Sequence, residues 1–388
     1  MKFKRIFLIV LDSLGIGEAK DADKFDDLGS NTLGHIIERT GLDFPNLKKL
    51  GFLNLIGNND ETNAVYSKAE PLSNGKDTLT GHLEMMGVHT VIPFKTFMKD
   101  GCFPKELIEE LEKQTGRKVI GNCVASGTEI IKELGEEHME TGSIIVYTSA
   151  DSVLQIAAHE DVISLDELYD ICEKARKITL KDEWKVGRII ARPFIGTNKD
   201  NFVRQNGHRH DYALNPAHET VLDKLKNNGY SVISIGKISD IFNNCGITSI
   251  NKTNDNLDWI NKILNTLDLD FTGLCFANLN DFDSKYGHRR DVVGYGNAIL
   301  EFDNYLPKII EKMKENDLLI ITADHGNDPT YKGTDHTREN VAVLNYHKNI
   351  RNKQLDNFKT FGCIGKTIAD NFDIDIEIDE ANSYLSEL

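Results

Sequence analysis

An apolar run that stops abruptly at an acidic residue and a histidine is the feature that most constrains how this chain can fold. Residues 318–328 read LLIITADHGND, so a strand-like segment ends at Asp324 and His325. Eleven residues later the sequence supplies His336. A carboxylate and an imidazole at the end of a buried strand cost stability unless something compensates both groups. The pattern therefore predicts that these side chains meet partners where the strand ends.

Two further apolar runs end in the same kinds of side chain. Residues 5–11 lead directly into Asp12, and residues 274–279 are followed by Asp283 and His288. The carboxyl ends of parallel strands lie at one edge of an open α/β sheet, where such folds bind their ligands. Carboxylate and imidazole groups together are typical ligands of first-row transition metals. We therefore predict a metal site at this edge of the sheet.

Strand-like runs alternate with amphipathic helical patterns, which is typical of an α/β fold with a mainly parallel sheet between helices. A helix is predicted at 215–228, where Asn215 can cap the first turn, and another near 306–313, where apolar residues recur at helical spacing. Strands are predicted at 5–11, 231–236, 273–279, 318–323 and 341–346.

The middle of the chain carries its own set of elements and none of the predicted metal ligands. We predict that residues 96–214 form an inserted α/β domain, and that residues 1–95 and 215–388 form the catalytic core. The elements expected in the insert are helices near 104–116 and 166–178 and strands at 143–149 and 187–194.

Composition excludes several classes of protein. The net charge is −16, which disfavours non-specific binding to nucleic acid or to anionic membranes. The six cysteines are widely spaced without a C-x-x-C pair, which predicts reduced thiols in a cytoplasmic protein. The first apolar run has only the length of a strand and ends at Asp12, and no run approaches the roughly 20 residues that span a bilayer. We therefore expect a soluble protein.

The predicted ligands are too many for one four-coordinate metal ion. They divide into two sites, and two divalent ions roughly 4 Å apart can clamp a transferring phosphoryl group. Mixed oxygen and nitrogen ligands without cysteine suit manganese or zinc. The ligands are Asp12, Asp283, His288, Asp324, His325 and His336.

A nucleophile for phosphoryl transfer is expected in the segment 73–88, SNGKDTLTGHLEMMGV, which reads as a polar loop entering a helix. Thr78 and Thr80 are both candidates, and their spacing alone does not separate them. A threonine hydroxyl needs a metal or a base to activate it. The amino terminus of the helix would stabilise phosphate oxygens.

The motifs VLDSLGIGEA, GKDTLTGH, NDFDSKYGHRRD and TADHGNDPTYKGTDHTRE resemble those of the phosphopentomutase family, within the alkaline phosphatase superfamily. The middle segment adds NCVASGTEI, IVYTSADSVLQIAAHE, GRIIARPF and RHDYAL, which are similar to the cap domain of that family. The resemblance extends in order over essentially the whole chain. It implies an alkaline-phosphatase-like core with an inserted cap.

The resemblance also implies roles for individual residues. It implies that Thr78, which stands four residues before His82, and not Thr80, is the phosphorylated nucleophile. One metal site would be formed by Asp12, Asp324 and His325 with the Thr78 oxygen, and the other by Asp283, His288 and His336. The cap would recognise the sugar and its second phosphate, and with Lys237 of the core its contacts would be Ser149, Asp151, Arg188, Arg204 and Arg209.

The activity that the resemblance implies is interconversion of ribose 1-phosphate and ribose 5-phosphate, and of the corresponding deoxyribose phosphates. A phosphothreonine would donate its group to form a 1,5-bisphosphate and then recover the other phosphate. The implied cofactors are two Mn²⁺ ions, with a sugar bisphosphate such as glucose 1,6-bisphosphate as activator, and the expected assembly is a monomer. Leu83 stands where many members carry an aromatic residue, a departure that concerns local packing.

Other activities remain compatible with parts of the pattern. A metal-dependent phosphatase or phosphodiesterase could use the same ligands, and the cap motifs argue against it. A sulfatase needs C/S-x-P-x-R, and the segment CFPKE at 102–106 lacks the arginine. A cofactor-independent phosphoglycerate mutase would carry a serine nucleophile and a larger insert. A non-catalytic metal-binding or sugar-phosphate-sensing protein should have lost some of these residues.

Overall fold

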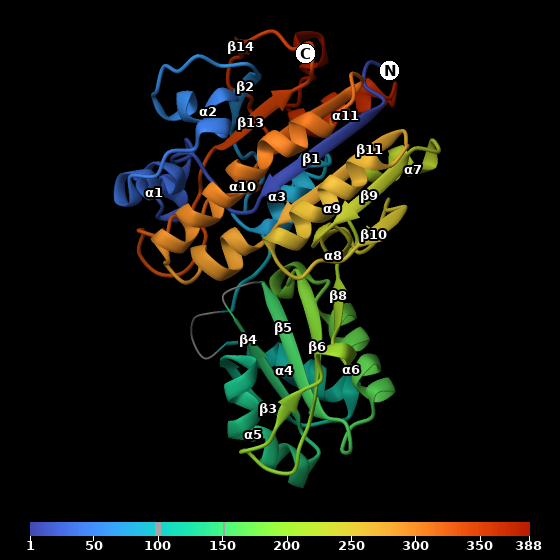
Figure 1. The fold of residues 1–388 in the computed structure, drawn as a ribbon. Coiled ribbons are helices and arrows are strands. Elements are labelled where there is room, and N and C mark those ends of the chain that lie inside the picture. The colour runs from blue at the N-terminus through green and yellow to red at the C-terminus, as the bar shows by residue number, and fades with distance from the viewer. Residues whose placement is uncertain (98–101, 150–151) are drawn as a thin grey trace. The chain divides into compact units, whose positions relative to one another are not determined.

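The three apolar runs that end in acidic residues lie side by side as parallel strands in the computed structural model (Figure 1). Strand β1 (Arg5–Leu11) pairs with β11 (Gly273–Leu279) on one side and with β12 (Asp317–Thr322) on the other. The register places Leu11 opposite Leu279, at the last position of both strands. All three strands are buried along their length, as expected for a parallel sheet covered on both faces. The residues that follow them therefore leave the sheet at one edge.

The structure describes residues 1–97, 102–149 and 152–388, and these form two units. The core unit comprises Met1–Pro93 and Asn215–Leu388, and the inserted unit comprises Phe94–Leu214. The boundaries expected from the sequence, after residues 95 and 214, lie within two residues of these. Within the described ranges, no helix combines the length and the apolarity needed to cross a membrane.

The core sheet has the order β10-β9-β11-β1-β12-β13-β2-β14. Neighbouring strands are parallel from β10 to β12, whereas β13 is antiparallel to both β12 and β2. The sheet is therefore mainly parallel, which confirms the predicted α/β class. The remaining strands are β2 (Val65–Ala69), β9 (Ser231–Ile235), β10 (Ser249–Asn251), β13 (Val341–Tyr346) and β14 (Lys353–Gln354).

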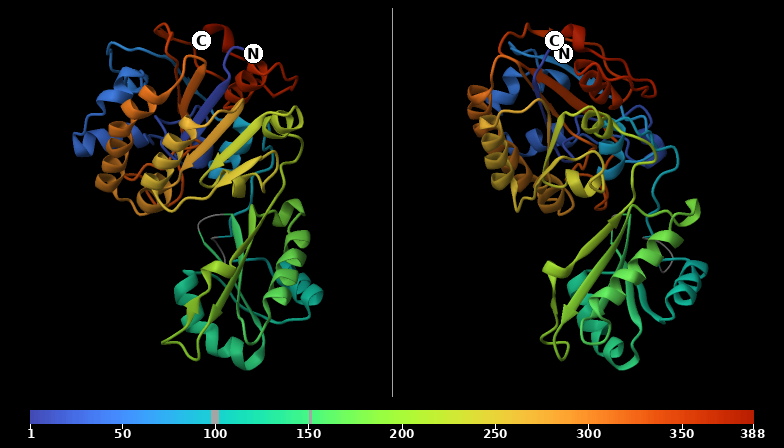
Figure 2. Two further views of the ribbon diagram at one scale, coloured as in Figure 1. Left: turned by 45° about the vertical axis from the view of Figure 1, so that its right-hand side comes forward. Right: turned by 90° about the vertical axis from the view of Figure 1, so that its right-hand side faces the viewer.

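Helices cover both faces of the core sheet (Figures 1 and 2). Helices α1, α9 and α10 lie on one face, and α3, α7 and α11 lie on the other. The bounds are α1 (Thr32–Thr40), α2 (Pro45–Lys49), α3 (Thr78–Met85), α7 (Val221–Asn227), α8 (Ile238–Ile241), α9 (Asn256–Asp268), α10 (Val292–Lys312) and α11 (Gly362–Asn371).

One predicted helix start is wrong. The helix expected at 215–228 begins at Val221, and Asn215 does not cap it. Thr220 and Asp223 form a reciprocal capping box, in which the Thr220 hydroxyl accepts from the Asp223 amide and the Asp223 carboxylate accepts from the Thr220 amide. This arrangement satisfies two amide donors, whereas an asparagine cap satisfies one, so the later start prevails.

The inserted unit is a second α/β layer structure with the strand order β3-β4-β5-β6-β7, and β8 pairs with β6. Helices α4 and α6 pack on one face of its sheet, and α5 packs on the other. The bounds are β3 (Val119–Val124), β4 (Ile144–Thr148), β5 (Val153–His159), β6 (Arg188–Ile195), β7 (Val203–Arg204), β8 (His210–Ala213), α4 (Lys105–Thr115), α5 (Gly127–Thr141) and α6 (Leu165–Ile178).

A buried histidine in the inserted unit predicts that its stability depends on pH. His138 is fully buried, its Nδ1 lies 2.5 Å from the Ser143 carbonyl, and its Nε2 accepts from the His159 amide at 2.8 Å. Burial lowers the pKa of His138, so the folded unit holds the neutral ring. An unfolded histidine titrates near about 6.5. As the pH falls through that value, the unfolded chain gains a proton that the folded unit does not, and stability falls.

We expect the urea midpoint of the inserted unit to decrease between about pH 6.5 and pH 5. Trp184 lies in this unit, so its fluorescence in a Trp259→Phe background reports its unfolding. The matched control is His138→Gln, which keeps an acceptor but does not titrate, and its midpoint should change less over this range. Equal pH slopes in the two proteins would show that His138 does not contribute.

Candidate metal centre

A π-helical turn brings Asp283 and His288 together. The turn spans Phe282–Gly287 directly after β11, and the His288 amide donates to the Asp283 carbonyl at 3.1 Å, an i to i+5 bond. Such turns are rare and often occur at functional sites. The five-residue spacing seen in the sequence thus places both side chains on one side of the turn, with Asp283 Oδ2 and His288 Nε2 3.2 Å apart.

An isolated β-bridge brings His325 and His336 together. Gly326 and Thr337 exchange backbone hydrogen bonds of 3.1 and 2.8 Å. The histidines that precede these two residues therefore lie next to each other, with ring centroids 4.1 Å apart. An added Cβ at Gly326 would meet the Glu339 side chain at 2.5 Å, so the bridge requires glycine there.

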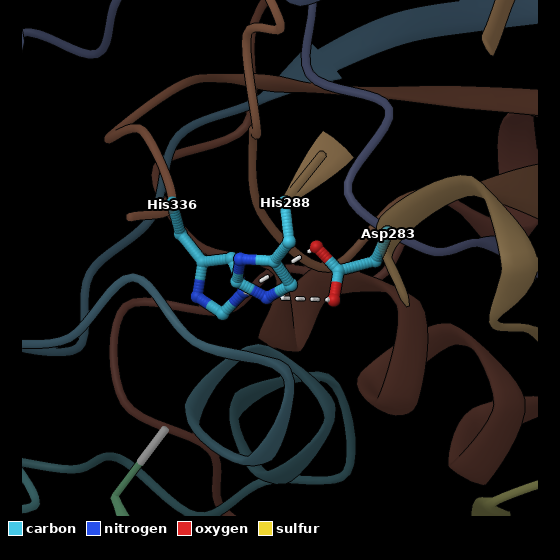
Figure 3. Close-up of side chains that lie close together, drawn as sticks. All are labelled: Asp283, His288 and His336. Atoms are coloured by element: carbon cyan, nitrogen blue, oxygen red, sulfur yellow. Dashed lines mark hydrogen bonds and ion pairs between the residues drawn. The ribbon is translucent and has the colours of Figure 1, made fainter. Parts of the chain in front are cut away.

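Asp283, His288 and His336 form the first ligand group (Figure 3). Their ligand atoms lie within 4.8 Å of one another, and Asp283 Oδ1 is 3.3 Å from His336 Nε2. The Nδ1 of His288 lies 2.8 Å from the Thr334 carbonyl, so Nδ1 carries the hydrogen and Nε2 faces Asp283 and His336. A backbone carbonyl on the far ring nitrogen is the usual support of a metal-binding histidine.

Asp12, Asp283 and His325 form the second ligand group, so the Asp283 carboxylate is common to both. The Nδ1 of His325 lies 2.9 Å from the Gly326 carbonyl, which directs Nε2 into the group. This Nε2 is 3.5 Å from Asp12 Oδ1, 3.5 Å from Asp324 Oδ2 and 3.2 Å from the Thr78 hydroxyl. The family resemblance placed Asp283 in one site only, whereas the structure brings it into both groups.

Two buried carboxylate oxygens without hydrogen-bond partners in the described part of the chain indicate that this centre suits a cation. Among the described residues, Asp12 Oδ1 and Asp324 Oδ2 are buried without a hydrogen-bond partner. The second oxygen of each carboxylate is held, since Asp12 Oδ2 accepts from Asn278 at 2.9 Å and Asp324 Oδ1 accepts from the Ser13 amide at 2.9 Å. Unpartnered buried anions are costly. One fixed oxygen and one open oxygen on each carboxylate fit a divalent metal ion.

The charge balance of the centre also favours cations. Burial and the nearby Asp324 carboxylate raise the pKa of Asp12. Burial alone would lower the pKa of His325, but Asp324 and Asp12 hold it well above its ordinary value. Burial alone would raise the pKa of Asp283, but His336 and His288 hold it well below its ordinary value. A buried group of carboxylates that stabilises positive charge on His325 will also stabilise divalent cations.

Several supporting residues gave no signal in the sequence. Asn327 donates to Asp283 Oδ1 at 2.7 Å, and Arg290 in turn donates to the Asn327 side-chain oxygen at 2.5 Å. Ser13 has a φ of 68°, which is unfavourable for a non-glycine residue, and its hydroxyl bonds to Tyr295 at 2.8 Å. Backbone strain of this kind is concentrated at functional sites. Single asparagines and serines carry no periodic pattern, so only coordinates reveal these roles.

Thr78 is the first residue of α3, and its half-buried side chain faces His325. Asp77 caps the helix and accepts from both the amide and the hydroxyl of Thr80, at 3.0 and 2.7 Å. The structure therefore separates the two threonines that spacing left equivalent. The Thr80 hydroxyl is used in the cap, whereas the Thr78 hydroxyl lies against His325 of the second ligand group.

Two buried side chains of opposite charge hold the loop that precedes Thr78. The Glu84 carboxylate accepts from the amides of Leu72 and Ser73, with its shortest bond 2.7 Å. Arg338, only 1% exposed, donates to backbone carbonyls of the same loop, including those of Ser73 and Gly75 at 2.6 Å. The loop is thus fixed through both its donors and its acceptors.

Arginines gather on the α5 face of the inserted sheet. Arg209 binds Asp211 through two bonds of 2.6 and 2.7 Å, and Arg188 lies 3.6 Å from the same carboxylate. Burial alone would raise the pKa of Asp211, but these arginines and Arg192 hold it below its ordinary value. Guanidinium groups gathered in this way can bind an anionic ligand.

The amino terminus of α5 contributes to this cationic face. An added Cβ at Gly127 would lie 2.6 Å from the Tyr147 hydroxyl and 3.2 Å from Arg204, so both groups adjoin the first turn. The Tyr147 hydroxyl is buried without a partner among the described residues. The sequence identified Arg204 but missed Tyr147 and Arg192, because a tyrosine and an arginine within strands are ordinarily structural.

The remaining predicted contacts are less informative. Ser149 follows β4 in the inserted unit, and Asp151 lies outside the described residues. Lys237 belongs to the core unit, where it precedes α8. All six cysteines are unpaired.

Comparison with known proteins identifies the group to which this geometry belongs. The sequence model of the Metalloenzyme superfamily matches residues 4–376. The PH0037 protein from Pyrococcus horikoshii superposes with a TM-score of 0.52 at 13% identity, over 97% of this chain and 100% of that one. Phosphoglycerate mutase from Leishmania mexicana superposes with a TM-score of 0.52 at 11% identity, over 98% and 97% of the two chains. At these identities the two structures establish a common fold.

Proposed function

Because the chain belongs to the Metalloenzyme superfamily, we propose that it is a phosphopentomutase that interconverts ribose 1-phosphate and ribose 5-phosphate, and the deoxyribose equivalents. The observation that carries the proposal is the Thr78 hydroxyl, which lies 3.2 Å from His325 Nε2 at the edge of the ligand groups. The motifs of the inserted unit support a mutase over a phosphatase or phosphodiesterase with the same ligands.

Two divalent cations, when bound by the two ligand groups, would neutralise charge on a transferring phosphoryl group. Asp12, Asp324 and His325 would hold one ion and His288 and His336 the other, with Asp283 between them. Mn²⁺ is the metal we propose, because mixed carboxylate and imidazole ligands suit manganese or zinc and the family resemblance implies manganese.

Thr78 would carry the phosphoryl group during transfer, and the first turn of α3 would stabilise it. Phosphorylated Thr78 would give its phosphoryl group to the free sugar hydroxyl, so that the bond from phosphorus to Thr78 Oγ1 breaks and one to the sugar oxygen forms. The proton of the sugar hydroxyl passes to Thr78 Oγ1. The Thr78 hydroxyl then takes the other phosphoryl group of the 1,5-bisphosphate, so that the bond from this phosphorus to the sugar oxygen breaks and the proton of Thr78 Oγ1 passes to that oxygen. The first-turn amides of α3 lack partners within the helix and would stabilise phosphate oxygens.

The inserted unit would bind the phosphate that is not reacting. Its α5 face presents Arg188, Arg192, Arg204 and Arg209, and guanidinium groups bind phosphate oxygens in pairs. A mutase must also keep water from its phosphothreonine, because hydrolysis would convert it into a phosphatase. We propose both roles for this unit, with Ser149 and Lys237 as further substrate contacts and glucose 1,6-bisphosphate as the activator that phosphorylates Thr78.

Phosphorus NMR tests the proposal. Ribose 5-phosphate is incubated with the protein and Mn²⁺, and samples are quenched with a chelator at successive times before their spectra are recorded. With a trace of glucose 1,6-bisphosphate in the reaction, we expect a ribose 1-phosphate signal that grows to a constant ratio without inorganic phosphate. Steady release of inorganic phosphate would instead identify a phosphatase. An unchanged spectrum would contradict the proposed substrate.

A further inference from the structure

His82 occupies an unusual position between the nucleophile and the metal ligands. It is fully buried, lies one helical turn after Thr78 on α3, and stacks on Phe276 with ring centroids 5.6 Å apart. Its Nδ1 lies 2.9 Å from the Thr78 carbonyl and 3.2 Å from Asp324 Oδ2. One ring nitrogen therefore faces both the backbone of the nucleophile and a carboxylate that we assign to metal binding.

Asn278 determines which ring nitrogen of His82 carries the hydrogen. The Asn278 side-chain nitrogen lies 2.9 Å from Asp12 Oδ2 and 3.3 Å from His82 Nε2. The first of these contacts is a hydrogen bond that the Asn278 amide NH₂ donates to Asp12 Oδ2. The second N–H of that group then points to His82 Nε2, which has to accept. The neutral ring is therefore fixed with its hydrogen on Nδ1.

His82 Nδ1–H donates to the Thr78 carbonyl at 2.9 Å, and Asp324 Oδ2 lies 3.2 Å from the same nitrogen. The Thr78 carbonyl belongs to the turn that presents the nucleophilic hydroxyl. Asp324 Oδ2 has no hydrogen-bond partner among the described residues, so its contact with His82 is electrostatic and leaves this oxygen open to a cation. Through Asn278, the same chain of contacts reaches the fixed oxygen of Asp12. His82 thus links the nucleophile to both carboxylates, and a side chain that only filled the space would need none of these polar contacts.

We propose that His82, held in its Nδ1–H form by Asn278, is a positioning residue that fixes the Thr78 turn relative to Asp12 and Asp324. This inference deepens the proposed phosphoryl transfer and rests on it. Partners that orient metal ligands typically affect metal affinity or activity by about 10–100-fold. The residue acts through its neighbours and does not itself contact the substrate.

Two replacements of His82 separate positioning from packing. His82→Phe keeps an aromatic ring against Phe276 but removes both nitrogens. His82→Asn loses the ring but places an amide N–H close to the position of Nδ1. We expect His82→Phe to lower kcat for phosphoryl transfer by about 10–100-fold with KM little changed, and to weaken one of two Mn²⁺ sites in calorimetry by a similar factor. His82→Asn should recover most of both losses.

The opposite pattern would overturn the proposal. If His82→Phe retains Mn²⁺ affinity and kcat, or if it and His82→Asn lose them equally, the ring serves packing alone. Thermal unfolding of each variant shows whether the fold persists.

A second measurement does not depend on activity. ¹⁵N NMR of histidine-labelled protein in the presence of a chelator reports which ring nitrogen carries hydrogen, and the His82→Phe spectrum assigns the signal. We expect the Nδ1–H form, and an Nε2–H form would contradict the inference even if the enzyme is active. If wild-type protein fails to interconvert pentose phosphates, this signal and the Mn²⁺ affinities still decide the role of His82, so the two failures are distinguishable.

Discussion

Thr78→Ala is expected to abolish phosphoryl transfer, with a loss of at least about 10⁴-fold, the order found when a covalent nucleophile is removed. The reason is geometric, since the Thr78 hydroxyl is the one that faces His325, at 3.2 Å. Metal binding should persist, because the carboxylates and imidazoles of both ligand groups remain. Mass spectrometry after incubation with glucose 1,6-bisphosphate should show a phosphorylated wild-type protein and an unmodified variant.

Thr80→Ala is the matched control for this result. It removes a hydroxyl from the same helical turn, but one that bonds to Asp77 and not to the metal ligands. We expect a loss of stability of about 1 kcal/mol with turnover largely retained. Thr78→Ser, which keeps a hydroxyl, should still become phosphorylated. Retained turnover in Thr78→Ala, or its loss in Thr80→Ala alone, would reverse the assignment.

The gathering of the candidate ligands could be predicted from the sequence because each acidic residue closely follows a buried strand. Asp12, Asp283 and Asp324 each come after a buried strand, and neighbouring parallel strands place their next residues at one edge of the sheet. His288 and His336 could be identified from the sequence because each lies a short distance from an acidic residue or a second histidine. The π-turn and the β-bridge that explain this spacing could not be predicted.

The supporting contacts could not be predicted, because they join residues that are distant in sequence and individually ordinary. Asn278 lies within a strand, and its amide meets a carboxylate 266 positions away. Arg338 looks like an exposed charge in the sequence, yet it is buried and holds a loop 263 to 267 positions away. The start of α7 was missed for a local reason, since two competing caps lay close together and the one with more hydrogen bonds prevailed.

Asp283→Asn is expected to have the second large effect, because its carboxylate is the group shared by both ligand groups. The substitution keeps the shape and an acceptor for Asn327 but removes the charge. We expect both Mn²⁺ sites to weaken by more than about 100-fold, beyond the effect of losing a supporting contact. Transfer should fall by about 10³-fold or more, since charge stabilisation of the phosphoryl group is lost. Calorimetry measures the number of ions bound.

The stoichiometry distinguishes a shared ligand from an ordinary one. Wild-type protein should bind two Mn²⁺ ions, Asp324→Asn should retain the ion held by Asp283, His288 and His336, and Asp283→Asn should retain neither at the same concentration. The matched control is Asp281→Asn, whose carboxylate bonds to the Asn256 amide and to Lys285 outside both groups, and it should bind two.

Thermal unfolding gives an independent measure of the same difference. A ligand at 100 times its Kd stabilises the folded state by about 2.7 kcal/mol for each site. Mn²⁺ should therefore raise the Tm of wild-type protein and of Asp281→Asn most, that of Asp324→Asn less, and that of Asp283→Asn hardly at all. If Asp283→Asn and Asp324→Asn each lose one ion, Asp283 belongs to a single site, and the shared carboxylate inferred from the geometry is wrong.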